Sequence, residues 1–152
     1  MSNPDISLPR DVEIAKIKRF SANVEEWLGI IVPDTKISTK VNVSQGIASV
    51  EYNTGGDFFG ATATGFGVTY VLPIIVQALI ATTKKNALII IENPEAHLHP
   101  KGQTEMAKLI TQAIEAGAQV IIETHSDHLF DGFRLSVKEK PILSNSIIAY
   151  WF

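Results

Sequence analysis

A carboxylate directly follows an apolar run near the middle of the chain. Leu88 to Ile91 are all aliphatic, and Glu92 comes next. Such a run is typical of a buried parallel strand, and open α/β sheets bind ligands at the carboxyl ends of their strands. A buried carboxylate there needs a metal ion, a hydrogen-bond donor or a lysine partner. Glu92 is therefore a candidate ligand for the metal of a metal–nucleotide complex, or else a cap for the next turn.

The histidines fall in two short segments. His97 and His99 follow the first apolar run, and His125 and His128 follow a second one. Imidazole and carboxylate groups are zinc ligands, so a metal-dependent hydrolase that uses His97, His99, His125 and Glu92 is one hypothesis. Five residues separate the first run from His97, whereas a hydrolase pair usually sits at the strand end itself. The alternative is that the histidines of the first segment cap the helix that follows.

His125 lies just beyond the second predicted strand, Gln119 to Glu123. Parallel strands place their carboxyl ends at the same edge of a sheet. We therefore expect His125 and Glu92 to lie at one edge, within about one side chain's reach across neighbouring strands. The alternative is an ordinary surface histidine.

A glycine-rich segment contains an incomplete phosphate-binding motif. Gly55 and Gly60 have the spacing of a P-loop, but Ala61 and Thr62 stand where Lys-[ST] is required, and no G-x-x-x-x-G-K-[ST] occurs in the sequence. Without the lysine, the β- and γ-phosphates lack their main charge partner.

The end of this segment leads into an apolar helix. Gly65, Phe66, Gly67 and Val68 precede or open that helix, and backbone amides at a helix amino terminus favour anions. The alternative is that these glycines only permit a tight turn and close packing.

Composition narrows the class of protein. The 152 residues suffice for one domain with a core, 45% are hydrophobic and 19% charged, and the net charge is −3. This balance indicates a globular protein without a broad basic surface for nucleic acid. The absence of cysteine excludes disulfides and thiolate chemistry. No secretory signal and no membrane span is recognised, since the longest apolar stretch, Val68 to Ala81, is too short. The expected compartment is the cytoplasm.

Periodicity predicts the elements of an α/β domain over residues 1–152. A helix is expected from Asp11 to Leu28, ended by Gly29, followed by a small antiparallel β-hairpin subdomain at about 35–56, a loop over 53–67 and a buried helix over 68–81. An alternation of strands and helices follows, which favours a parallel sheet. Its strands are predicted at 87–91, 119–123 and 146–151, and its helices at 103–116 and 126–137.

Three segments, taken together and in this order, resemble one family. Residues 65–75 resemble a signature motif and its helix, residues 88–100 a Walker B segment and D-loop, and residues 121–129 a switch-histidine segment. They resemble bacterial predicted ATPases of the ATP-binding-cassette class, AAA-type relatives of the structural-maintenance-of-chromosomes (SMC) and overcoming-lysogenization-defect ATPases. The resemblance runs from about Glu25 to Phe152 and implies a P-loop NTPase-like fold of the cassette-head type.

The resemblance also implies roles for particular residues. Glu92 would be the magnesium-side acid and His125 the histidine that senses the γ-phosphate. Asn93 occupies the place of a catalytic glutamate; an amide can position water but cannot act as a general base, so Glu95 or another group would have to serve. The signature residues Gly65, Phe66, Gly67 and Val68 would contact the nucleotide of an opposing subunit, and His97 and His99 would belong to the D-loop.

The missing P-loop implies a partner. The sequence resembles the carboxyl-terminal half of such an ATPase, so Mg²⁺ and ATP are expected only when a P-loop-bearing chain or a second copy completes it, and none alone. The family sheet places the P-loop strand beside the switch-histidine strand, and an unpaired edge recruits another chain. Two outcomes compete with this: residues 146–151 close directly onto Gln119–Glu123, or the domain is a non-enzymatic dimerisation or regulatory module.

Overall fold

Two parallel strands form the centre of the α/β part. The computed structural model describes residues 10–42, 44–53, 58–60, 66–139 and 147–150. Strand β4 (Leu88–Glu92) pairs in parallel with β5 (Gln119–Glu123), with Leu88 opposite Gln119 and Glu92 opposite Glu123. Helix α3 (Pro100–Glu115) connects them, because parallel neighbours require a long crossover. The predicted strand–helix–strand unit is confirmed.

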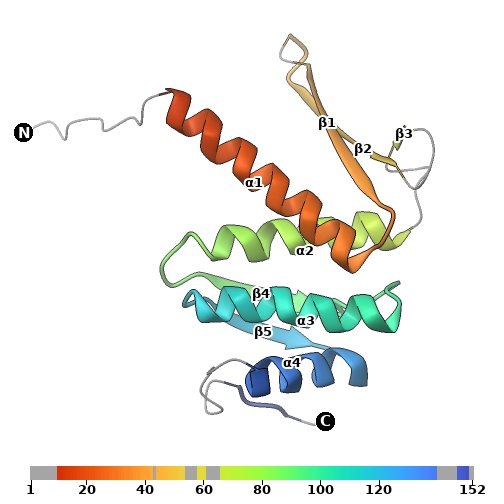
Figure 1. Ribbon diagram of the computed structural model, residues 1–152, viewed down its shortest axis with the longest axis vertical. Helices are drawn as coiled ribbons and strands as arrows, with labels where there is room; N and C mark the ends of the chain where they lie inside the picture. Colours follow the sequence, from red (N-terminus) through yellow and green to blue (C-terminus); the bar gives the residue numbers. More distant parts are fainter. Residues whose placement is uncertain (1–9, 43, 54–57, 61–65, 140–146, 151–152) are drawn as a thin grey trace, which may run out of the picture.

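Four helices stack in layers around this pair (Figure 1). Helix α1 (Arg10–Ile31) lies on α2 (Phe66–Ala81) and α3, and α4 (Asp127–Glu139) packs on the other side of α3. Buried residues of α3 recur at three- and four-residue intervals, the spacing of one helix face. They include Met106, Leu109, Ile110 and Ala113, all fully buried.

Helix α1 continues past the predicted stop at Gly29 and ends at Ile31. Leu28 and Ile31 are among the most deeply buried side chains of the protein, and the amide of Val32 donates to the carbonyl of Leu28 at 2.8 Å. Burial of this last turn therefore outweighs the weak helix propensity of one glycine, which costs about 1 kcal/mol relative to alanine.

The small antiparallel sheet has three strands. Strands β1 (Lys36–Asn42) and β2 (Ile47–Asn53) form the predicted hairpin, and β3 (Phe58–Gly60) adds to β2. The prediction of a loop over 53–67 was wrong at β3, since a three-residue strand is too short to leave a periodic pattern. Tyr52 of β2 is buried in the common core, and burial raises the pKa of its phenol. This side chain ties the sheet to the helices.

The predicted last strand is absent where the structure describes it. Residues 147–150 of the predicted strand 146–151 have no regular structure and do not pair with β5. Ile147 packs against the core, whereas Ile148 and Tyr150 are exposed. Among the described residues β5 therefore pairs on one side only, with β4, and its other edge has no partner strand.

One face of the parallel pair is open. Ile89 and Ile91 are buried against the helices, whereas Leu88, Ile90 and Ile121 are exposed by 58%, 65% and 58%. We call Leu88, Ile90 and Ile121 the open apolar face. Parallel sheets are normally covered on both faces, so this face has the composition of an interior surface without a covering layer among the described residues.

The contact between α3 and α4 yields a stability prediction. A Cβ on Gly132 would lie 2.6 Å from the Cβ of Ala107, so Gly132→Ala must push the two helices apart. We expect a loss of roughly 1–3 kcal/mol in the free energy of unfolding, measured by urea denaturation.

Gly29→Ala is the matched control. It is also a helical glycine, but a Cβ there would meet nothing within 4 Å, so we expect a gain of up to about 1 kcal/mol. Equal effects of the two substitutions would contradict the packing described for α3 and α4.

Candidate functional site

The carboxyl ends of β4 and β5 bring the predicted site residues together. Glu92 lies opposite Glu123, and the amide of Asn93 donates to the Glu123 carbonyl at 2.8 Å. His125 follows two residues after Glu123, so it lies at the same end of the sheet as Glu92. Glu92 is exposed, and the expectation of a buried carboxylate was wrong because no described element covers the open face.

Residues 93–99 form a tightly wound loop between β4 and α3. The amide of Ala96 donates to the Asn93 carbonyl at 2.9 Å, and the amide of Leu98 to the Glu95 carbonyl at 3.0 Å. Asn93 and His97 have φ angles of +46° and +61°, the left-handed region that costs most residues about 1–2 kcal/mol. Pro94 and Leu98 are buried, and their burial holds the loop in this conformation.

Glu95 connects this loop to the segment after β5. Its Oε1 accepts the amide hydrogen of His125 at 2.8 Å, while its Oε2 is buried without a hydrogen-bond partner. The carboxylate is therefore engaged in holding the backbone of His125 in place. Its second oxygen has no hydrogen-bond partner among the described residues, which leaves its acceptor capacity unused.

Two residues that the sequence did not single out reinforce this connection. The side-chain Nε2 of Gln103 donates to the Leu98 carbonyl at 2.9 Å, and the Ser126 hydroxyl donates to the Gln103 side-chain oxygen. Ser126 also accepts the amide hydrogen of Leu129 at 3.1 Å, as a helix N-cap does. A serine one residue before α4 was a usable signal for this role; Gln103 left none, since its bonding depends on tertiary contacts.

The two histidines of the loop have different surroundings. His99 caps α3, since its Nδ1 accepts the amide hydrogen of Lys101 at 3.4 Å and Pro100 occupies the first helical position. The capping alternative thus holds for His99. His97 instead packs edge-on against the ring of Tyr70 in α2, with the ring centroids 6.4 Å apart.

These groups do not form a zinc site. Within the described residues, which include His97, His99, His125 and Glu92, no three histidine, aspartate or glutamate side chains are close enough to hold one metal ion. The hydrolase hypothesis therefore has no geometric support. Mg²⁺ needs fewer protein ligands than zinc, because it often binds one or two carboxylates and completes its coordination shell with phosphates and water. The exposed Glu92, with Glu123 beside it, fits that requirement.

The residues predicted to form the signature motif lie around the start of α2, where Gly67 approaches the 93–99 loop. Gly65 lies outside the described residues, and Phe66 is the first residue of the helix. A Cβ on Gly67 would lie 3.1 Å from the His97 carbonyl oxygen, so the helix approaches the 93–99 loop closely. Val68 is buried in the core, which leaves only its backbone to reach a nucleotide.

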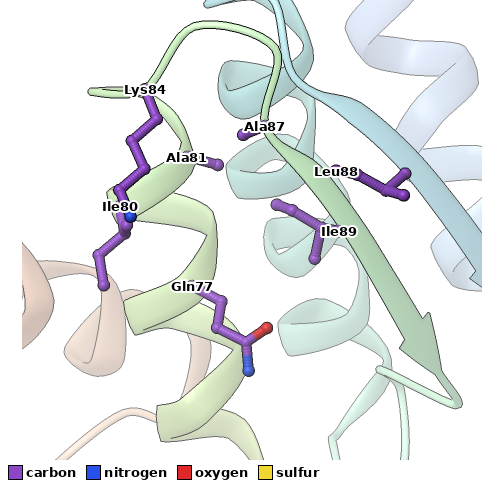
Figure 2. A pocket seen from close by; sticks show the side chains of 7 residues that line it. All are labelled: Gln77, Ile80, Ala81, Lys84, Ala87, Leu88 and Ile89. Atoms are coloured by element: carbon purple, nitrogen blue, oxygen red, sulfur yellow. The ribbon is translucent and has the colours of Figure 1, made fainter.

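Two shallow hollows lie between α2 and β4. The one in Figure 2, of about 320 Å³, lies at the amino end of β4, far from Glu92 along the strand, and its lining includes Lys84 and Ala87. The other, of about 360 Å³, extends along β4 to Glu92 and is bordered by Thr69 and Tyr70 of α2. Both hollows are wide open to solvent, so the described part of the site is an open surface.

The sequence profile of the AAA ATPase domain matches residues 5–130. The chain belongs to the AAA ATPase domain family. The match includes both the 93–99 loop and the segment with His125. No curated protein matches.

Solved SMC head structures share the fold of this AAA ATPase domain. An SMC head bound to the winged-helix domain of ScpA has a TM-score of 0.66 at 19% identity, over 81% of this chain and 39% of that one. An SMC ATPase studied for ATP-driven dimerization and DNA-stimulated activation has a TM-score of 0.62 at 18% identity, over 82% and 78%. The Pyrococcus furiosus SMC head bound to ScpA has a TM-score of 0.64 at 16% identity, over 80% and 32%. The chain thus spans about two fifths of the first of these proteins. No described helix is long and apolar enough to cross a membrane.

The bond between Glu95 and His125 can be tested by hydrogen exchange. A hydrogen bond to a carboxylate contributes roughly 1.5–3 kcal/mol, so Glu95→Ala is expected to speed exchange of the His125 amide by about tenfold or more. Glu105→Ala, which removes a carboxylate paired with Lys108 on α3, is the control and leaves that amide unchanged. Equal exchange rates in the two variants would show that Glu95 does not hold His125.

Proposed function

We propose that this AAA ATPase domain supplies the Walker B, D-loop, signature and switch-histidine elements of a cassette-type ATPase, and that a P-loop-bearing partner completes the nucleotide site. The observation that carries the proposal is the joint fixing of two strand ends. Asn93 bonds to Glu123 and Glu95 to His125, so Glu92 and His125 are held at one end of the sheet.

Each residue has a distinct role in this proposal. Glu92 would hold Mg²⁺, which would neutralise the charge that develops on the phosphates. His125 donates a hydrogen bond to the γ-phosphate. Asn93 orients water through its amide but accepts no proton. Glu95 positions His125 through Oε1, and its unpartnered Oε2 makes it the candidate for the proton acceptor that Asn93 is not.

The open apolar face supports the requirement for a partner. The printed sequence contains no G-x-x-x-x-G-K-[ST], and Leu88, Ile90 and Ile121 are exposed on the sheet that carries Glu92. Full burial of each such side chain is worth roughly 1.5–3 kcal/mol. We infer that the P-loop-bearing partner covers this face and pairs with the free edge of β5, which would bring its phosphate-binding loop to the end of the sheet with Glu92 and His125.

The isolated chain is expected to show no measurable ATP hydrolysis. It lacks the lysine and amide cradle that position the phosphates, and positioning with charge stabilisation supplies most of phosphoryl-transfer catalysis. Steady-state phosphate release by the purified 152-residue chain measures this. Turnover that Glu92→Gln abolishes would contradict the requirement for a partner.

The partner is tested by isolating the tagged chain from its native cells. The proposal requires an associated chain that contains G-x-x-x-x-G-K-[ST] and restores ATP hydrolysis when the two purified chains are mixed. A strictly monomeric chain, or a P-loop chain that binds without restoring hydrolysis, would contradict it.

Two matched substitutions locate the docking surface. Ile90 on the open apolar face and Ile17 on α1 are both 65% exposed. We expect Ile90→Lys to abolish association with the P-loop chain, because it buries a charge, and Ile17→Lys to leave it intact. Light scattering of the mixed chains measures both, and loss of association in neither variant would exclude this face.

A further inference from the structure

One peptide unit at the end of β4 is held from both sides. The amide of Asn93 donates to the Glu123 carbonyl at 2.8 Å. The carbonyl of the same peptide unit, that of Glu92, accepts a hydrogen bond from the Tyr70 hydroxyl at 3.1 Å. A trans peptide directs its N–H and C=O groups to opposite sides, and the described chain contains no cis bond. The unit is therefore fixed between β5 on one side and α2 on the other.

The orientation of this unit sets the direction of two side chains. The peptide plane runs from the Cα atom of Glu92 to the Cα atom of Asn93. Asn93 has a φ of +46°. Rotation of this plane would change the direction of the Glu92 carboxylate and of the Asn93 side-chain amide. Tyr70 thus influences the direction of these two side chains through its hydrogen bond to the backbone.

Tyr70 also contacts the 93–99 loop. Its ring meets the His97 ring edge-on, at an interplanar angle of 77°. Gly67 lies three residues before Tyr70, on the same face of α2, and closely approaches the His97 carbonyl. At the amino end of α2, Gly67 therefore lies against His97, which has a left-handed backbone conformation. Tyr70, one turn later, contacts the end of β4.

We propose that Tyr70 is a positioning residue that couples the amino end of α2 to Glu92 and Asn93. A displacement of the helix start, where Gly67 lies, is passed by the rigid first turns of α2 to Tyr70 and through its hydroxyl to the Glu92–Asn93 peptide. The consequence for catalysis rests on the proposed function: engagement of the helix start by a nucleotide would adjust the magnesium-side acid. The mechanical coupling itself does not depend on it.

Nuclear magnetic resonance of the isolated chain tests the coupling. Gly67→Ala adds a Cβ only 3.1 Å from the His97 carbonyl oxygen and displaces the helix start relative to the loop. We expect it to shift the amide resonances of His97 and of Asn93. Combined with Tyr70→Phe, it should still shift His97, through direct contact, but should shift Asn93 at most half as far. An undiminished Asn93 shift in the double variant would overturn the proposal.

The single variant Tyr70→Phe provides a second test, which can be used if Gly67→Ala does not fold. It keeps the ring and removes only the hydroxyl, and Tyr70 is 42% exposed, so the fold should tolerate it. The Glu92 carbonyl and Asn93 amide resonances should move, while the His97 ring resonances stay. The control is Tyr150→Phe, at an exposed tyrosine elsewhere, which should move none of these. Unchanged Glu92 and Asn93 resonances in Tyr70→Phe would overturn the proposal.

Kinetics with a P-loop partner separate this proposal from the proposed function. In the reconstituted ATPase, Tyr70→Phe should lower kcat by about fivefold, the effect of one neutral hydrogen bond, with KM unchanged. A raised KM with unchanged kcat would contradict a positioning role. If the unmutated chain also showed no hydrolysis with the partner, the proposed function would be contradicted. The coupling proposal would not be affected, because the resonance shifts test it independently.

Discussion

The parallel register of β4 and β5 is the constraint on which the site depends. Because Glu92 lies opposite Glu123, the segments that follow the two strands emerge at the same end of the sheet. Backbone bonding then continues beyond the strands, from Asn93 to Glu123 and from His125 to the Glu95 side chain. An antiparallel pair would separate the acidic and histidine groups by about the length of a strand, and a shift in register would separate them by about 3.3 Å for each residue shifted.

Packing of the helices protects this register. Helix α3 links the two strands and is buried between α4 and the helices of the amino-terminal half. The amino end of α2 touches the 93–99 loop through Gly67 and Tyr70. The loop is therefore fixed by α2, α3 and the segment after β5 at once, which is how two residues with left-handed backbone conformations persist in it.

Much of this arrangement follows from local sequence. Aliphatic runs predicted β4 and β5, and helical periodicity predicted α3, because the apolar pattern of each element shows which of its residues are buried. The third strand of the small sheet, β3, and the continuation of α1 past Gly29 could not be predicted this way. They depend on pairing with β2 and on burial of Leu28 and Ile31, which are tertiary contacts. The exposure of Glu92 and the irregular structure of residues 147–150 could not be predicted either, because both depend on which elements lie beside β4 and β5.

The candidate residues divide in the same way. Glu92 and His125 were predicted from the strand ends, which the parallel register places at one end of the sheet, whereas Asn93 was singled out by the family resemblance. The bonding of Glu95 to His125 joins residues 30 positions apart, and the contact of Tyr70 with the Glu92 carbonyl joins residues 22 positions apart. No single-sequence pattern marks such contacts. The roles assigned to all of these residues in ATP hydrolysis stay a proposal.

Paramagnetic broadening by Mn²⁺ with ATP tests the central claim most directly. In a complex of the isotope-labelled chain with an unlabelled P-loop partner, Mn²⁺ substitutes for Mg²⁺ at the nucleotide. The account predicts that broadening is confined to the two strand ends, with Glu92, Asn93 and His125 affected most. Broadening that is strongest elsewhere on the chain, or is absent while the partner retains the nucleotide, would contradict the assignment of this sheet edge to the nucleotide site.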